Sequence, residues 1–303
     1  MARGRLFAII IAGWIVTGGC GGSIDRQAPR EESGVEPRRI ISLAPSLTET
    51  LFALGLGNRL VGVTRYCAHP SAAVNLPKVG GHLDPNFEAI VALSPDLVVA
   101  IPSSREIRQR LESLGIRVLE VDQHDVEAVL ESISTIADAC GVSERGEALT
   151  AELRGGLERI RSIVGESPRP RAVVVIGHQV GGGSVRSVWT AGPDTFYDGV
   201  LQIAGGVNAV EGGLARYPEM SREGLASLDP DVVLDLVAGI EERDLDVERI
   251  REEWERLTEL RAVRENRVRV LAGDLMVVPG PRLPEMVEVF ARSLHPGLDW
   301  SAE

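Results

Sequence analysis

The sequence contains the same short unit twice, as EAIVALSPDLVV at residues 88–99 and as EGLASLDPDVVL at residues 223–234. Glutamate, leucine, proline and aspartate recur at the same places, and the two copies are 135 residues apart throughout. Each copy indicates a short helix, a tight turn at Pro-Asp, and a strand that is buried on both faces. Two copies of one construction predict two similar lobes with a pseudo-twofold relation and a ligand cleft between them.

The segments around the first copy alternate between strand and helix patterns. Ser46 and Glu49 have the spacing of a capping box, which predicts that a helix begins at Ser46. Strands that alternate with helices predict a parallel sheet with crossover helices. Strands are expected at 38–44, 60–64, 97–101 and 117–121, and further helices at 86–93, 104–115 and 126–139.

One long helix is expected between the two halves of the chain. Apolar residues keep a helical spacing through residues 143–164, despite a Gly-Gly pair in the middle. At 1.5 Å per residue such a helix is roughly 33 Å long, enough to connect two lobes. The pattern then restarts with strands at 171–177, 231–236 and 267–271 and helices at 194–206, 246–260 and 283–294.

The expected fold is therefore α/β, with two Rossmann-like lobes that contain mainly parallel sheets. One long bridging helix joins the lobes, and the ligand cleft lies between them. The expected boundaries are 38–142 for the N-terminal lobe, 143–166 for the bridging helix and 167–303 for the C-terminal lobe.

The first part of the chain is expected to lie outside this fold. Two arginines precede an apolar run at residues 6–16, and small residues then lead to Cys20. This order is typical of a secretory signal and resembles the bacterial lipoprotein pattern. We expect a signal peptide at 1–19, lipidation of Cys20, and a flexible tether at 20–37. A plain secretory peptide, in which Cys20 has no role, is the alternative.

Composition and motifs argue against several classes of function. The formal net charge is −12, with 32 basic and 44 acidic residues, so a nucleic-acid partner is not expected. The sequence has no Walker loop, no Gly-x-Gly-x-x-Gly after its first strand and no complete Gly-x-Ser-x-Gly elbow, so we expect no enzyme. Only 5 histidines occur, without metal-ligand spacing, so neither a protein-ligated metal nor a resident cofactor is expected.

Two histidines and two cysteines have open interpretations. His82 and His178 each follow a strand-like segment, one in each half, and facing histidines could ligate a metal or the axial position of a macrocycle. Export makes a disulfide between Cys67 and Cys140 chemically possible, but two distant cysteines do not establish one.

Glu88 and Glu223 fall in the first turn of the two matching helices. Acidic residues interact favourably with the helix dipole at this position, which is a sufficient local reason for both. Because they repeat, they could also form a pair of exposed carboxylates that docks a symmetric basic partner.

Three segments, at 38–67, 76–100 and 218–236, resemble one known family. This family comprises the periplasmic binding proteins for vitamin B12 and ferric siderophores, which are the substrate-binding components of ABC importers. The resemblance covers about residues 38–296. It implies two α/β lobes joined by one long helix, with the ligand between the lobes and little hinge motion.

The resemblance also implies partners and a location. A glutamate on each lobe of these proteins engages arginines of the membrane permease, and the matching positions here are Glu88 and Glu223. The expected protein is a monomer at the periplasmic or cell surface, anchored only through lipidated Cys20, that acts with a permease and its ATPase. An adaptor lipoprotein is the other class, and it would use the same glutamates without binding a small ligand.

Ligand contacts are expected on loops that follow strands, since ligands of open α/β sheets bind there. Tyr66 is the foremost candidate because its ring combines a large stacking area with a polar tip. Core packing is the alternative role for each aromatic residue. The candidates are Arg65, Tyr66, Gly81, His82 and Leu83 in the first lobe and Trp189, Tyr217, Met276 and Arg282 in the second.

The same residues suit more than one metal-chelate ligand. Tyr66, Trp189 and Tyr217 suit the flat macrocycle of a corrinoid, whereas the arginines suit an anionic ferric siderophore. The segments TRYC at 64–67 and GGHLDPN at 80–86 resemble the B12-binding members most closely. The expected ligand is therefore a corrinoid, with a ferric siderophore or haem as the alternative.

Overall fold

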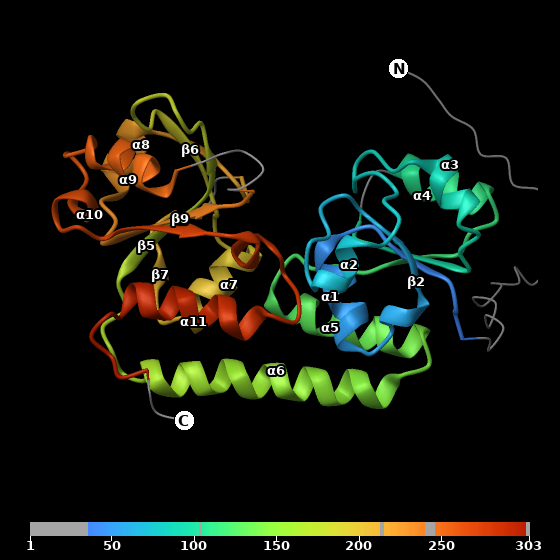
Figure 1. Cartoon of the computed structure of the whole chain (residues 1–303). Helices are drawn as coiled ribbons and strands as arrows, with labels where there is room; N and C mark the ends of the chain where they lie inside the picture. Colours follow the sequence, from blue (N-terminus) through green and yellow to red (C-terminus); the bar gives the residue numbers. More distant parts are fainter. Residues whose placement is uncertain (1–35, 103–104, 213–214, 240–245, 301–303) are drawn as a thin grey trace, which may run out of the picture. The chain divides into compact units, whose positions relative to one another are not determined.

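Two separate β-sheets, one on each side of helix α6 in the sequence, form the frame of the computed structural model (Figure 1). The structure describes residues 36–102, 105–212, 215–239 and 246–300. The expected signal peptide, Cys20 and residues 20–35 of the expected tether lie outside the described residues and stay predictions.

The first sheet is parallel throughout, with the strand order β2-β1-β3-β4. Its strands are β1 (Ile40–Ser42), β2 (Leu60–Val63), β3 (Leu97–Ala100) and β4 (Val118–Glu120). Its helices are α1 (Pro45–Ala53), α2 (Ser71–Val74), α3 (Phe87–Ala92), α4 (Arg105–Ser113) and α5 (Val126–Ala139), with the 3-10 turn η1 (Gly57–Arg59).

The second sheet has the order β10-β9-β5-β6-β8, and β7 also pairs with β5. The strands β5 (Arg171–His178), β7 (Val207–Asn208), β9 (Val232–Val237) and β10 (Val268–Ala272) pair in parallel. Their order β7-β5-β9-β10 repeats the order β2-β1-β3-β4 of the first sheet. The antiparallel strands β6 (Ser187–Thr190) and β8 (Glu219–Ser221) are additions to this shared frame.

Helices and a 3-10 turn complete the second lobe. They are α7 (Phe196–Ile203), α8 (Arg222–Leu228), α9 (Val247–Glu255), α10 (Arg261–Arg264), η2 (Asp274–Val277) and α11 (Leu283–Leu294). Each sheet has an apolar cluster on both faces, and successive side chains of a strand point to opposite sides. In β5, for example, Val174 joins one apolar cluster, whereas Val173 and Val175 join the other. The expected α/β fold with two lobes is confirmed.

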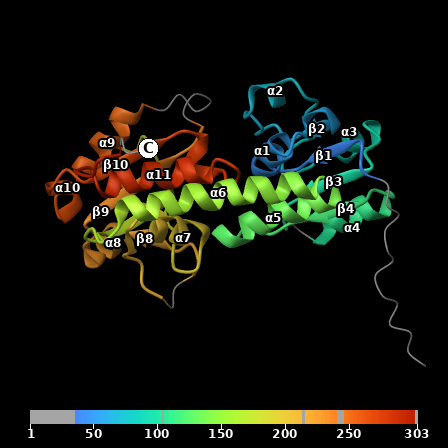
Figure 2. The same ribbon diagram turned by 90° about the horizontal axis from the view of Figure 1, so that it is seen from below.

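Helix α6 (Ser143–Val164) belongs to the cores of both lobes. Leu153 packs in the first-lobe core, whereas Leu157 and Ile160 pack in the second-lobe core. Figures 1 and 2 show α6 alongside α5 and α11, one helix from each side of the chain. The described residues contain no helix that is both long enough and apolar enough to span a membrane.

The repeated unit has the same local geometry in both lobes. Asn86 and Ser221 are the N-caps of α3 and α8, and each side chain accepts a hydrogen bond from the backbone N–H three residues later. At the other end of the helices, Ser94 (φ 44°) and Asp229 (φ 40°) both adopt the left-handed conformation. The sequence repeat therefore predicts cap, helix and turn together.

The aspartate that follows the proline anchors the strand in both copies. The backbone N–H of Asp96 donates to the carbonyl of Arg39, and the Asp96 carboxylate accepts the Arg39 N–H at 3.0 Å. Asp231 makes the same two bonds with Arg171, and its carboxylate accepts the Arg171 N–H at 2.8 Å. Each aspartate thus fixes the start of one strand against the start of the central strand of its sheet.

The expected capping box at Ser46 and Glu49 is wrong. Helix α1 begins at Pro45, whose fixed φ suits the first helical position, and its N-cap Ala44 makes no side-chain cap bond. Ser46 instead donates to Gln123 at 2.6 Å. Glu49 is buried and forms an ion pair with Arg282 of the second lobe. The side chains of Ser46 and Glu49 therefore make long-range contacts and do not cap the helix.

The two cysteines of the described chain are free thiols in the first-lobe core. The Cys67 sulfur lies 3.1 Å from the hydroxyl oxygens of Thr48 and Thr64. Burial raises the pKa of the Cys140 thiol to about 11. The disulfide that the sequence left open is not formed in this structure.

Candidate functional site

A cavity of about 630 Å³ is lined by residues from both lobes. Glu49 of α1 and Tyr66 of the loop after β2 line its first-lobe side, and Asp274 and Arg282 line its second-lobe side. Tyr66 follows a strand of a parallel sheet, which is where open α/β sheets bind ligands. The remaining lining residues are Pro45, Arg65, Ala68, His69, Ala238, Gly239, Val277 and Val278.

A buried ion pair between Glu49 and Arg282 connects the two lobes at this cavity. The Nε of Arg282 donates to Glu49 Oε2 at 2.8 Å, and its Nη2 donates to Glu49 Oε1 at 2.5 Å. The Glu49 side chain is 4% exposed and that of Arg282 is 20% exposed. The hydrogen bonds to Glu49 outweigh desolvation and raise the pKa of Arg282. This bidentate geometry fixes the orientation of the guanidinium, which can therefore present its remaining N–H groups to a ligand.

Tyr66 is supported by a charged pair and left accessible. Tyr66 is 59% exposed, and the Arg65 guanidinium lies over its ring at 4.9 Å from the centroid. Arg65 in turn contacts both carboxylate oxygens of Asp84, at 2.7 and 2.8 Å. A Cβ at Gly81 would lie 2.3 Å from Asp84 Oδ1 and 3.2 Å from Tyr66 Cε2. A side chain at this position would therefore displace the Asp84 carboxylate from its place beside Arg65.

The other two residues of the predicted first-lobe set lie beside this turn. Leu83 is highly exposed, as a ligand contact would have to be in the free protein. His82 is half-buried, and this burial lowers its pKa. The structure thus brings all five predicted first-lobe residues into one neighbourhood.

The predicted second-lobe residues divide into three groups. Arg282 lines the cavity. Trp189 on β6 and Tyr217 before β8 are exposed at the antiparallel edge of the second sheet, but they do not line the cavity. Met276 is buried in the second-lobe core, and its carbonyl accepts the Tyr197 hydroxyl at 3.1 Å. The structure therefore does not bring the Met276 side chain to the cleft; its neighbour Val277 takes that position.

A second compartment of about 350 Å³ shares Pro45, Val277 and Val278 with the first cavity. Ser46 and Gln123 line it and are hydrogen-bonded to each other. Sequence reasoning missed Glu49, Gln123 and Val277. Gln123 had a usable signal, because it follows a strand of the first sheet by three residues, as Tyr66 does.

His178 has a structural partner away from the cavity. Its Nε2 donates to Asp235 Oδ2 at 2.8 Å, and Trp254 Nε1 donates to the same oxygen at 2.8 Å. The side chains of His178 and Asp235 are 2% and 0% exposed. Burial opposes protonation of His178, but the hydrogen bond and charge of Asp235 outweigh it, so its pKa is raised. Within the described ranges, no group of three or more His, Cys, Asp or Glu side chains could hold a metal ion.

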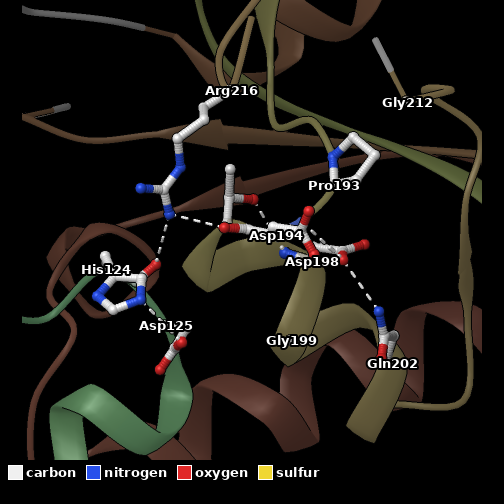
Figure 3. Close-up of a pocket in the computed structure, with 10 residues that line it drawn as sticks. His124, Asp125, Pro193, Asp194, Asp198, Gly199, Gln202, Gly212 and Arg216 are labelled. Atoms are coloured by element: carbon white, nitrogen blue, oxygen red, sulfur yellow. Dashed lines mark hydrogen bonds and ion pairs between the residues drawn. The ribbon is translucent and has the colours of Figure 1, made fainter. Parts of the chain in front are cut away.

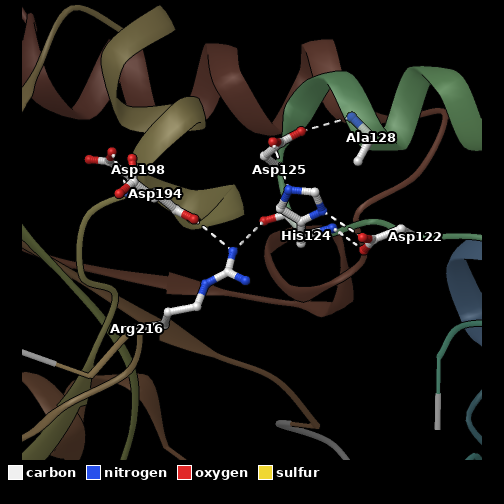
Figure 4. A network of polar contacts seen from close by, with 7 residues as sticks. All are labelled: Asp122, His124, Asp125, Ala128, Asp194, Asp198 and Arg216. Atoms are coloured by element: carbon white, nitrogen blue, oxygen red, sulfur yellow. Dashed lines mark hydrogen bonds and ion pairs between the residues drawn. The ribbon is translucent and has the colours of Figure 1, made fainter. Parts of the chain in front are cut away.

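A polar cavity of about 580 Å³ lies where the β4–α5 loop faces α7 (Figure 3). The Nη2 of Arg216 donates to the carbonyl oxygen of Asp194 at 2.6 Å and to that of His124 at 3.4 Å. Arg216 therefore connects the two lobes at this cavity. The His124 ring lies between the carboxylates of Asp122 and Asp125, at 2.7 and 3.0 Å (Figure 4). This cavity lacks the aromatic and aliphatic lining of the first.

The two glutamates predicted to dock a partner occupy equivalent exposed positions. Glu88 lies in the first turn of α3, and Glu223 lies in the first turn of α8. The residues two positions further on, Ile90 and Leu225, are both fully buried. The repeat therefore points both carboxylates to solvent from equally anchored helices.

Comparison with known proteins identifies the family. The model of the family described as "Periplasmic binding protein" matches residues 40–275. A "Cobalamin-binding protein" of Halobacterium salinarum (strain ATCC 29341 / DSM 671 / R1) is 32% identical over 275 residues, which cover 86% of this chain and 70% of the relative. The "Uncharacterized ABC transporter substrate-binding lipoprotein YvrC" of Bacillus subtilis (strain 168) is 27% identical over 321 residues, with 97% and 98% coverage.

A solved structure agrees with these relatives. The "Periplasmic Heme Binding Protein from Pseudomonas aeruginosa" has a TM-score of 0.75 and 30% sequence identity, and the match covers 87% of this chain and 94% of that one. The family consists of transport components and not of enzymes, as the sequence predicted. The chain therefore belongs to the periplasmic binding protein family and is a substrate-binding component of an ABC importer of the B12, haem or siderophore type.

Proposed function

We propose that this protein binds a corrinoid in the cleft between its lobes and delivers it to the permease and ATPase of an importer. The observation that carries the proposal is the 630 Å³ cavity, which the exposed Tyr66 ring and the Arg282 guanidinium both line. The ring offers a stacking surface for a flat macrocycle, and the guanidinium offers donors to its polar side groups. The 32% identity to a cobalamin-binding protein supports the same ligand.

Haem or a ferric siderophore is the second candidate. Both arginines of the cavity, Arg65 and Arg282, suit ligands with carboxylate or other anionic groups. The similarity to a haem-binding structure at 30% identity supports this alternative.

Calorimetric titration of the protein with cyanocobalamin, cobinamide, haem and a panel of ferric siderophores tests the proposal. We expect saturation with the two corrinoids. Tyr66→Ala should weaken that binding about tenfold or more, while Tyr66→Phe, which keeps the ring, should lose less. If only haem or a siderophore binds, that compound and not a corrinoid is the ligand. If none of these compounds binds, the protein is not the binding component of a metal-chelate transporter.

We also propose that Glu88 and Glu223 dock the permease. Changing both to lysine should abolish uptake and leave ligand affinity within about threefold, because the glutamates lie outside the cavity. Glu144→Lys is the matched control, since Glu144 is likewise an exposed acid in the first turn of a helix. If Glu144→Lys lost uptake to the same extent, the loss would not be specific to Glu88 and Glu223. Their favourable interaction with the helix dipole would then be a sufficient account of both residues.

Attachment to the membrane through lipidated Cys20 completes the proposal. Cys20→Ala should release the protein from the membrane fraction, and mass spectrometry of the wild-type protein should find a diacylglyceryl group on Cys20. A wild-type protein with no lipid would leave the plain secretory alternative.

A further inference from the structure

The two docking glutamates differ in the residue that precedes them. Phe87 precedes Glu88, whereas Arg222 precedes Glu223. A guanidinium beside Glu223 has two unfavourable effects on a basic partner: it can pair with the carboxylate, and it repels the partner's own positive charge. Docking at the second lobe therefore requires a group that neutralises Arg222, which docking at the first lobe does not.

Arg222 is held by a carboxylate from another part of the lobe. Its Nη2 donates to Glu259 Oε2 at 2.7 Å, and its Nε donates to Glu259 Oε1, so the pair is bidentate. Glu259 lies between α9 and α10, and its own carbonyl accepts a hydrogen bond from Arg264 at 2.7 Å. The neighbouring Leu257 and Leu260 are buried, which fixes this short segment to the core.

The groups that act on Glu223 come from these same residues. Its own backbone N–H and the Ser221 hydroxyl hydrogen-bond the carboxylate and lower its pKa, and the charge of Arg222 adds to the effect. Glu259 acts in the opposite direction. Glu223 is thus ionised and exposed, while the nearby guanidinium has its charge matched by a different carboxylate.

We infer that Glu259 is a positioning residue for docking: it holds Arg222 away from Glu223 and leaves that carboxylate free for an arginine of the permease. The inference rests on the proposed docking role of Glu223. In Glu259→Gln the bidentate acceptor is lost, so Arg222 pairs with Glu223 or faces the permease as an unmatched positive charge. Either outcome weakens association at the second lobe only.

The test is association of the full chain, in the presence of cyanocobalamin, with its purified permease–ATPase complex in nanodiscs, measured by biolayer interferometry. We expect Glu259→Gln to weaken association about three- to tenfold, mainly through the association rate. Arg222→Gln alone should bind at least as well as wild type. The double variant Arg222→Gln/Glu259→Gln should recover wild-type association, which a merely structural role of Glu259 would not allow.

The outcomes separate this inference from the docking role itself. Glu223→Gln should weaken association; if it does not, docking through Glu223 fails and the inference fails with it. If Glu223→Gln weakens association but Glu259→Gln does not, or the double variant is not restored, the inference alone is overturned. A ¹³C-NMR titration of Glu223 gives a second readout. Loss of the Glu259 charge alone lowers the pKa of Glu223, so pairing with Arg222 should make this pKa lower in Glu259→Gln than in Arg222→Gln/Glu259→Gln.

Discussion

The strand that follows the repeated turn is apolar in the first lobe but contains a buried carboxylate in the second. Ala100 of β3 and Asp235 of β9 occupy the same place, 135 residues apart. Asp235 is fully buried, and it accepts hydrogen bonds from His178 and Trp254. In the first lobe, Ala100 belongs instead to an apolar cluster that includes Ile41, Leu43 and Val98.

This difference shows that one backbone construction accepts two kinds of core. A buried carboxylate is strongly unfavourable unless nearby donors satisfy it. Asp235 is accommodated because β5 supplies the imidazole of His178 and α9 supplies the indole of Trp254. At this position, the core of the second lobe should therefore respond to loss of a single polar group and to pH, whereas the core of the first lobe should not.

Removing the carboxylate should give the largest effect. Asp235→Ala leaves the buried donors of His178 and Trp254 without an acceptor, and we expect a loss of about 3–5 kcal/mol in the free energy of unfolding. Ala100→Gly truncates the equivalent first-lobe side chain and should lose only about 0.5–1 kcal/mol. Urea denaturation measures both, and similar losses would show that the polar network does not distinguish the lobes.

The aspartates that anchor the two strands should behave alike. Asp96→Ala and Asp231→Ala each remove a charged acceptor from a backbone N–H, so each should lose about 1.5–3 kcal/mol. The same denaturation experiment compares them. A loss confined to one of the two variants would contradict the structural repeat at this position.

The pH dependence of stability should come from His178 in the second lobe, at pH values above 6.5. The pKa of His178 is raised in the folded protein, so its contribution is complete below its ordinary value of 6.5 and is lost as the pH rises through the folded pKa. Asp235 and Glu253 are the charged groups that face it. Thermal unfolding across this range should show a decline in stability for wild type, and His178→Gln should remove it; an unchanged slope in the variant would exclude His178 as the source.

The helix caps should give the smallest and most symmetric effect. Asn86→Ala and Ser221→Ala each remove one side-chain acceptor at the start of α3 or α8, so each should lose about 1 kcal/mol. Ser221→Ala should in addition raise the pKa of Glu223, because its hydroxyl hydrogen-bonds that carboxylate. Thermal unfolding and NMR titration separate the two effects, and a pKa that stays constant would show that the hydroxyl does not reach Glu223.

Much of the fold follows from local patterns in the sequence. The repeat predicted α3, β3, α8 and β9 because a capped helix, a tight turn and a continuous apolar run each leave a local pattern in the sequence. The strands β6 and β8 were missed because Ser187–Thr190 and Glu219–Ser221 are short edge strands with no long apolar run.

The site was predicted in part for the same reason. Arg65, Tyr66 and Arg282 reach the cavity as expected from loops and helix starts. Glu49 was misread as a local cap, because its true partner Arg282 lies 233 positions away. Met276 lies in the short turn η2, where one residue of rotation decides which side chain faces the core, and periodicity does not resolve that choice.

The sharing of α6 between two cores has a consequence for how the protein unfolds. Leu153 completes one core, while Leu157 and Ile160 complete the other, and they lie within two turns of a single helix. If one lobe unfolds and this helix frays, the other lobe loses side chains from its own hydrophobic core. We therefore expect one cooperative calorimetric transition, so that damage to either lobe presents the cell with a wholly unfolded chain and not with a surviving half.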